Sequence, residues 1–125
     1  MLVAIPAFGS RISPRFDCAP QFVFVEMEDG RVGSRREESV SHLHWRTRIA
    51  LLMERKVDVL LCGGIRRCDF LFLAEAGVKV CAGLVGMVDD VLEAFTRGEL
   101  SPLDPGGPGF GAGRRRRGAG RGRQT

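Results

Sequence analysis

The sequence predicts a single α/β domain built on a mixed β-sheet, followed by a low-complexity C-terminal segment. In the first half, strand-like segments are joined by a short turn, and in the second half apolar runs alternate with segments of helical periodicity. Hairpin-linked strands followed by strand–helix alternation imply a sheet that is antiparallel on one side and parallel on the other, with helices covering it. We expect the element order β-β-β-α-β-α-β-α.

The first half of the chain supplies three predicted strands. Residues 2–6 form a short apolar strand that runs into a polar, proline-containing loop over residues 7–20. Residues 21–28, rich in Phe and Val, form the next strand. The Asp-Gly pair that follows is typical of a hairpin turn and leads into a third strand over residues 31–38.

The second half alternates helices with strands. Apolar residues recur at helical spacing over residues 43–56, and a run dominated by Val and Leu over residues 57–62 predicts a buried strand. A second helix over residues 66–76 ends before a glycine, and residues 78–82 form a short strand. The last helix, over residues 87–97, has apolar residues on one face and a glycine after it.

Length and composition exclude several classes of protein. With 125 residues and 44% hydrophobic content, the chain can fill one ordinary core. No apolar run approaches the roughly 20 residues that cross a bilayer, and the first residues lack the pattern of a secretory signal, so we expect no membrane partner. Four scattered cysteines do not form a typical secreted disulfide framework, which predicts reduced thiols and a cytoplasmic location.

Residues 101–125 become rich in Gly and Arg, and we expect a flexible, disordered tail after a domain over residues 1–100. The last twenty residues hold six arginines and no acid, whereas the rest of the chain has 13 basic and 15 acidic residues. Such a tail could bind nucleic acid by neutralising phosphates, but its single aromatic, Phe110, provides almost no base stacking. Nucleic acid is therefore an alternative partner and not the expected one.

Three predicted loops should meet at one end of the sheet. If the first strand and the two later apolar strands are parallel neighbours, their carboxyl ends lead into residues 7–20, 62–68 and 82–87. In sheets of this kind, ligands gather beyond the carboxyl ends of the parallel strands. We expect the binding site of the protein where these loops converge.

The middle loop has the residues best suited to an anion. Gly63 and Gly64 let the backbone approach a ligand closely, and the helix start after them offers unpaired N–H groups. Cations are normally disfavoured at that end of a helix, so Arg66 and Arg67 indicate an anion held between them. A solvated helix start is the alternative interpretation.

The two thiols that flank this loop, Cys62 and Cys68, are candidate soft metal ligands. Their spacing lets a strand end and the first helical turn bring both sulfurs to one ligand, but it is not a zinc-knuckle or ferredoxin pattern. Packing in the core is the competing interpretation for Cys62, because free cysteine is often buried. Cys18 in the first loop is a further ligand candidate, or an incidental loop thiol, and Cys81 is expected in the core.

Two histidines, His42 and His44, stand at the start of the first predicted helix. Exposure or helix capping is the expected role of either one. Metal ligation is the sharper alternative, since neutral imidazole suits iron, copper and zinc, and we include His44 among the candidate ligands.

Several ordered motifs run through residues 1–100. They are Val3-Ala4-Ile5-Pro6, Ser13-Pro14-Arg15-Phe16-Asp17-Cys18-Ala19-Pro20, Phe24-Val25-Glu26 with Asp29-Gly30, Val57-Asp58-Val59-Leu60-Leu61-Cys62-Gly63-Gly64-Ile65, Ala76-Gly77-Val78-Lys79-Val80, Gly83, Gly86 and Leu92-Glu93-Ala94-Phe95-Thr96-Arg97-Gly98-Glu99-Leu100. In this order and spacing they resemble the dinitrogenase iron–molybdenum cofactor biosynthesis family, which includes small X- and Y-type cofactor carriers. One departure is Arg15, at a position where many relatives carry His.

The resemblance implies a ribonuclease-H-like α/β fold, no catalytic role in most members, and binding of metal–sulfur clusters such as the iron–molybdenum cofactor or its precursors. It also implies a donor or recipient protein of cofactor assembly as partner. We therefore predict a carrier in which Gly63, Gly64, Arg66 and Arg67 neutralise an anionic cluster. Thiolate or imidazole contacts would come from a set of four residues: Cys62, Cys68, Cys18 and His44.

Two other classes of function compete with the carrier. An electrostatic binder without a coordinate bond, or a regulatory protein whose partner is another protein, is the runner-up. An enzyme is not expected, because the first strand lacks the carboxylates of a two-metal nuclease. The sequence also has no Ser/His/Asp arrangement and no phosphate-loop motif.

Overall fold

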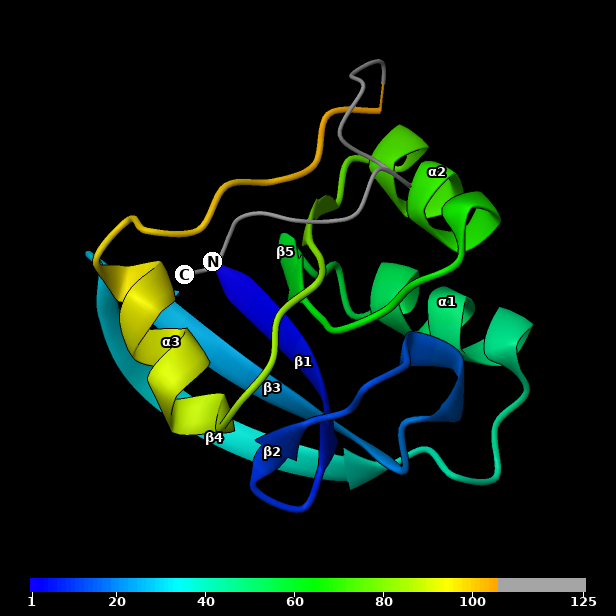
Figure 1. Cartoon of the computed structure of the whole chain (residues 1–125), viewed down its shortest axis with the longest axis horizontal. Coiled ribbons are helices and arrows are strands. Elements are labelled where there is room, and N and C mark those ends of the chain that lie inside the picture. The colour runs from blue at the N-terminus through cyan, green and yellow to red at the C-terminus, as the bar shows by residue number, and fades with distance from the viewer. Residues whose placement is uncertain (106–125) are drawn as a thin grey trace.

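A computed structural model describes residues 1–105 and shows one sheet with helices on both faces (Figure 1). The strands are β1 (Leu2–Phe8), β2 (Arg11–Ile12), β3 (Gln21–Glu28), β4 (Arg31–Ser39), β5 (Val59–Leu61) and β6 (Lys79–Cys81). The helices are α1 (Trp45–Glu54), α2 (Arg67–Glu75) and α3 (Val88–Thr96), and a 3₁₀ helix, η1, spans Phe16–Cys18. Of the predicted tail over residues 101–125, residues 106–125 lie outside the described residues.

The sheet has the mixed pairing that the sequence predicts. Its order is β4-β3-β1-β5-β6, with β2 paired to β1 outside this path. β1 pairs antiparallel with β3 and β3 with β4, while β1, β5 and β6 run parallel. The predicted Asp29-Gly30 turn joins β3 to β4, and both of its residues have positive φ, 52° and 74°, as a type I′ hairpin requires.

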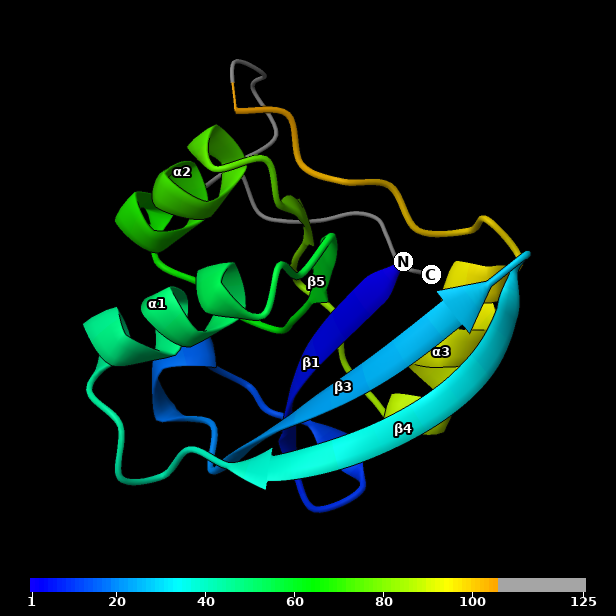
Figure 2. The same ribbon diagram turned by 180° about the vertical axis from the view of Figure 1, so that it is seen from behind.

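Two cores, one on each face of the sheet, hold the helices in place. α1 and α2 cover one face and α3 covers the other (Figure 2). Successive side chains of a strand point to opposite faces of the sheet and so contribute to both cores. Leu60 faces the core under α1 and α2, whereas its neighbour Leu61 faces the core under α3, and both are fully buried. None of the helices in residues 1–105 is long and apolar enough to span a bilayer.

The predicted loop over residues 7–20 contains regular structure that the sequence analysis did not expect. β1 continues to Phe8, turns at Gly9 (φ 63°) and returns as β2, and η1 follows. A two-residue strand is too short to show periodicity, and its second partner, Met87, is distant in the chain. Ordered contacts also continue past residue 100, since the N–H of Leu103 donates to the carbonyl of Val80 at 2.8 Å.

Candidate functional site

The three predicted loops meet at the carboxyl ends of β1, β5 and β6, and we call this end of the sheet the loop pole. The N–H of Gly64 donates to the carbonyl of Pro14 at 2.7 Å, and the N–H of Phe16 donates back to the carbonyl of Gly64 at 2.8 Å. The third loop joins through Gly83, whose N–H donates to the carbonyl of Gly63 at 2.9 Å. Backbone hydrogen bonds therefore hold the loop pole together.

The glycine pair is required by this internal contact. A Cβ at Gly63 would lie 2.5 Å from the carbonyl oxygen of Ser13 and 2.9 Å from that of Pro14. At Gly64 it would lie 3.0 Å from the Pro14 oxygen. The close backbone approach that the sequence analysis assigned to a ligand is thus made by the first loop, and the N–H of Gly64 is already used.

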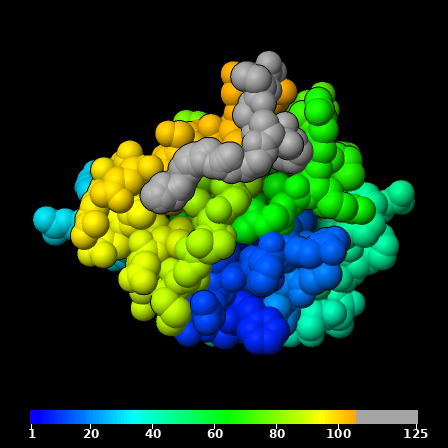
Figure 3. Space-filling model, viewed as in Figure 1, coloured from blue at the N-terminus to red at the C-terminus, as the bar shows by residue number. Residues whose placement is uncertain are grey.

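One half of the loop pole is apolar and lies beside α3. Phe8 pairs with Arg11 across β1 and β2, and Arg11 in turn pairs with Met87, so the three side chains stand in one row. Phe8 and Met87 are exposed, as is Val85 in the neighbouring loop. In Figure 3 the blue segment of residues 7–20 adjoins the yellow-green loop before α3.

The other half of the loop pole, which we call the η1–α2 junction (residues 15–18 and 64–68), carries charge and thiols. Arg66 caps the start of α2, and its guanidinium donates two hydrogen bonds to the Asp69 carboxylate, at 3.0 and 3.1 Å. The same guanidinium stacks on Trp45 at 4.3 Å from the ring centroid. The pairing with Asp69 raises the pKa of Arg66.

This geometry changes the interpretation of the two arginines. The side chain of Asp69 is only 1% exposed whereas that of Arg66 is 39% exposed, so Arg66 balances a buried carboxylate from the protein surface. Arg67 is exposed and forms no ion pair with any of the residues 1–105. Arg66 is the N-cap residue of α2 but makes no side-chain capping hydrogen bond, so it leaves the first N–H groups of the helix unsatisfied.

The four free cysteines fall into two classes. Cys62 is fully buried in the core under α1 and α2, and desolvation raises the pKa of its thiol far above the usual range. Cys81 is buried as predicted, and desolvation raises its pKa to about 12. A metal ligand must be a thiolate, so we leave Cys62 out of the proposed site. Cys18 and Cys68 are exposed at the η1–α2 junction.

His44 has the capping role that the sequence analysis expected. It is the N-cap residue of α1, and its Nδ1 accepts a hydrogen bond from the N–H of Arg46 at 3.3 Å. This bond occupies one of the two ring nitrogens. His42 is exposed in the segment before the helix.

Arg48 is a structural residue of the junction that the sequence analysis missed. It is 3% exposed and donates from Nε to the carbonyl of Leu43 at 3.1 Å. Its Nη1 donates to the carbonyls of Phe16 and Ala19, so it ties α1 to η1. A signal was present in the sequence, because Arg48 is three residues after Trp45 and four before Leu52 and so lies within the apolar stripe.

A model of the dinitrogenase iron-molybdenum cofactor family matches residues 1–98. The chain belongs to this family. The solved structure of PH0822 is similar to this chain with a TM-score of 0.75 and 28% identity, covering 82% of this chain and 94% of that one. A Thermotoga protein provisionally named as a NifB protein gives a TM-score of 0.63 and 30% identity, covering 82% and 92%.

Another similar structure supports the fold alone. A Methanocaldococcus jannaschii protein, provisionally named a dinitrogenase, has a TM-score of 0.71 at 21% identity, covering 82% of this chain and 94% of that chain. Membership of the iron-molybdenum cofactor family thus rests on the matched family model, and the mixed α/β architecture is shared with these relatives.

The ligand set of this family member is sparse. Within residues 1–105, no three His, Cys, Asp or Glu side chains are grouped so that they could hold a metal ion. A bare ion therefore has no ready cage in the described part of the chain. A bulky anion that brings its own sulfur ligands needs fewer protein contacts, which the η1–α2 junction can offer.

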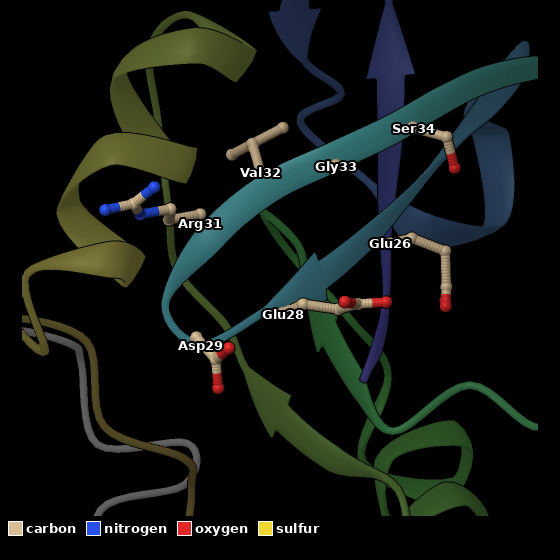
Figure 4. Close-up of a pocket in the computed structure, with 7 residues that line it drawn as sticks. All are labelled: Glu26, Glu28, Asp29, Arg31, Val32, Gly33 and Ser34. Atoms are coloured by element: carbon tan, nitrogen blue, oxygen red, sulfur yellow. The ribbon is translucent and has the colours of Figure 1, made fainter.

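A solvent-open hollow lies far from the loop pole, on the β3–β4 hairpin (Figure 4). Its lining residues are Glu26, Glu28, Asp29, Arg31, Val32, Gly33 and Ser34. None of them is a cysteine or a histidine, and acidic side chains outnumber the single arginine, so the hollow is poorly suited to an anionic cluster. We assign no function to it.

Proposed function

We propose that the chain binds an anionic metal–sulfur cluster, of the iron–molybdenum cofactor type or a precursor, as cargo at the η1–α2 junction. In this proposal it passes the cluster to a recipient protein and catalyses no reaction on it. Family membership supports the class of cargo. The observation that carries the location is that the two segments of the junction hold two exposed thiols, Cys18 and Cys68, together with Arg67, which forms no ion pair with residues 1–105, at a helix start without a side-chain cap.

The chemistry of the junction suits such cargo. Cys68 and Cys18 would provide thiolate contacts to iron or molybdenum, while Arg67 and the first N–H groups of α2 would neutralise the negative charge. Arg66 would contribute little attraction, because Asp69 already balances it. The junction is open to solvent at both thiols, which is compatible with cargo that has to leave again.

The deciding experiment is anaerobic reconstitution with isolated iron–molybdenum cofactor and, separately, with tetrathiomolybdate, followed by metal and sulfide analysis and an absorption spectrum. We expect uptake by the wild type and reduced uptake by the Cys18→Ser, Cys68→Ser double variant. Cys81→Ala is the matched control, because it removes one thiol from the core and should leave uptake unchanged.

Three results separate the versions of the proposal. A wild-type protein that remains colourless and metal-free would refute the carrier function. Uptake that survives loss of both exposed thiols but disappears in Arg67→Gln would support purely electrostatic binding. Uptake that survives all of these changes would place the cargo elsewhere on the molecule.

A further inference from the structure

Arg48 is a buried cation without a carboxylate partner. The residue is 3% exposed, and no Asp or Glu of residues 1–105 forms an ion pair with it. Its hydrogen bonds go to neutral acceptors only, the carbonyls of Leu43, Phe16 and Ala19. Buried charges are normally paired or bound to a ligand, so this one requires an explanation.

The negative groups that act on Arg48 all belong to η1. Desolvation lowers the pKa of Arg48, and electrostatic interactions with Cys18 and Asp17 oppose this effect. Asp17 is itself engaged by Arg15, which donates to both of its carboxylate oxygens at 3.1 and 2.9 Å. No carboxylate of residues 1–105 therefore forms an ion pair with Arg48, whose guanidinium is hydrogen-bonded to the carbonyls on either side of the exposed Cys18.

We propose that Arg48 is a positioning residue of the cargo site, which holds η1 in place and supplies a buried counter-charge to an anion bound at the η1–α2 junction. The inference rests on the proposed function and adds a residue to it. Through the carbonyls of Phe16 and Ala19, Arg48 fixes the two ends of the turn that presents Cys18. The N–H of Phe16 then connects η1 to Gly64 and the start of the α2 loop.

A buried charge attracts an anion differently from an exposed one. Salt screens Arg67, which is exposed, but screens Arg48 much less because little solvent lies around it. The two arginines should therefore contribute separable parts of the binding: a salt-sensitive part from Arg67 and a salt-resistant part from Arg48.

The test compares Arg48→Met, Arg48→Lys and Arg67→Gln in the full chain, with tetrathiomolybdate as the probe. Binding is measured anaerobically by equilibrium dialysis and molybdenum analysis, at low salt and at about 0.5 M NaCl. We expect Arg48→Met to weaken binding about tenfold or more at both salt concentrations. Arg48→Lys keeps the charge and should recover most of that loss, whereas Arg67→Gln should weaken binding at low salt only.

The possible outcomes test the charge of Arg48, its role in the site and the proposed function separately. Equal weakening in Arg48→Lys and Arg48→Met would mean that the hydrogen bonds to η1 matter and the charge does not, which overturns the counter-charge that the inference assigns to Arg48. Wild-type affinity in Arg48→Met would overturn it while leaving the proposed function intact, and failure of the wild type to bind would refute both. If Arg48→Met does not fold, the wild type and Arg67→Gln still test whether a buried charge contributes to binding. Loss of all binding at high salt in both proteins would show that it does not, and would overturn the inference.

Discussion

Replacing Gly63 by alanine tests the most specific feature of the loop pole. The added Cβ would lie 2.5 Å from the Ser13 carbonyl oxygen and 2.9 Å from the Pro14 oxygen, well inside the 3.4 Å at which ordinary contact begins. Both atoms belong to the backbone and cannot rotate away, so the first loop must retreat as a unit. That movement stretches the hydrogen bond between the N–H of Gly64 and Pro14, and the bond from the N–H of Phe16 to Gly64.

The expected cost follows from these two effects. Overpacking of a tight contact costs about 1–3 kcal/mol, and two weakened backbone hydrogen bonds add about 1 kcal/mol each. We therefore expect Gly63→Ala to lower the free energy of unfolding by about 3–5 kcal/mol, a large part of the stability of a small domain. The φ of Gly63 is not positive, so the effect is steric and involves no left-handed strain.

Gly9→Ala is the matched control, because alanine there causes backbone strain at a positive φ but no steric clash. Gly9 has φ 63°, and no atom lies within 4 Å of the position that a Cβ would take there, so alanine should cost only about 1 kcal/mol of backbone strain. Urea denaturation followed by the fluorescence of Trp45, the single tryptophan, and by circular dichroism measures both variants. A loss at Gly63 no larger than the loss at Gly9 would refute the packing account.

Three further predictions address the charges and thiols. In the folded protein two cysteines should react rapidly with iodoacetamide and two only after unfolding, as counted by mass spectrometry; the fast pair is Cys18 and Cys68 and the slow pair is Cys62 and Cys81. Arg66→Gln should lower the urea denaturation midpoint, because it leaves a buried carboxylate unpaired, whereas Arg67→Gln should leave the midpoint unchanged. The hydrogen bond from Arg55 holds the pKa of Glu38 below the usual 4.5, so the pair stabilises the fold above that pH and its contribution is lost as pH falls through the lowered pKa. Glu38→Gln should therefore reduce acid destabilisation by about 0.5 kcal/mol in denaturation curves between neutral and acidic pH; an unchanged acid limb would contradict this.

Much of the fold could be predicted because the local signals agree with the tertiary structure. The Asp29-Gly30 pair specifies its own turn type, and the alternation of apolar runs with helical stripes fixes the parallel half of the sheet. β2 and η1 could not be predicted, because each has two or three residues and is held by partners distant in the chain, Met87 for β2 and Arg48 for η1. The ribonuclease-H-like classification stays a prediction.

The convergence of the three loops at the carboxyl ends of the parallel strands was predicted correctly, whereas the surroundings of several residues there were not. Arginine at a helix start suggested an anion, yet the partner of Arg66 is Asp69, three residues further along the same helix. That spacing is visible in the sequence and would have identified the pair. The burial of Arg48 and Cys62 is harder to see, since a charge usually indicates a solvated face and a thiol after a strand can point either to a loop or to a core.

A glycine pair after a buried strand has two physical causes that look the same in a sequence. It can open space for a ligand, or it can let another loop of the same protein come close, and here Gly63 and Gly64 do the second. The proposed cargo site therefore does not include the glycines, because backbone atoms of Ser13 and Pro14 occupy the space next to them. What the glycines provide is the approach of the first loop, which brings η1 and Cys18 next to the start of α2. Under the proposed function, cargo binding at the η1–α2 junction would depend on this contact inside the protein, so Gly63→Ala should weaken cargo binding as well as stability.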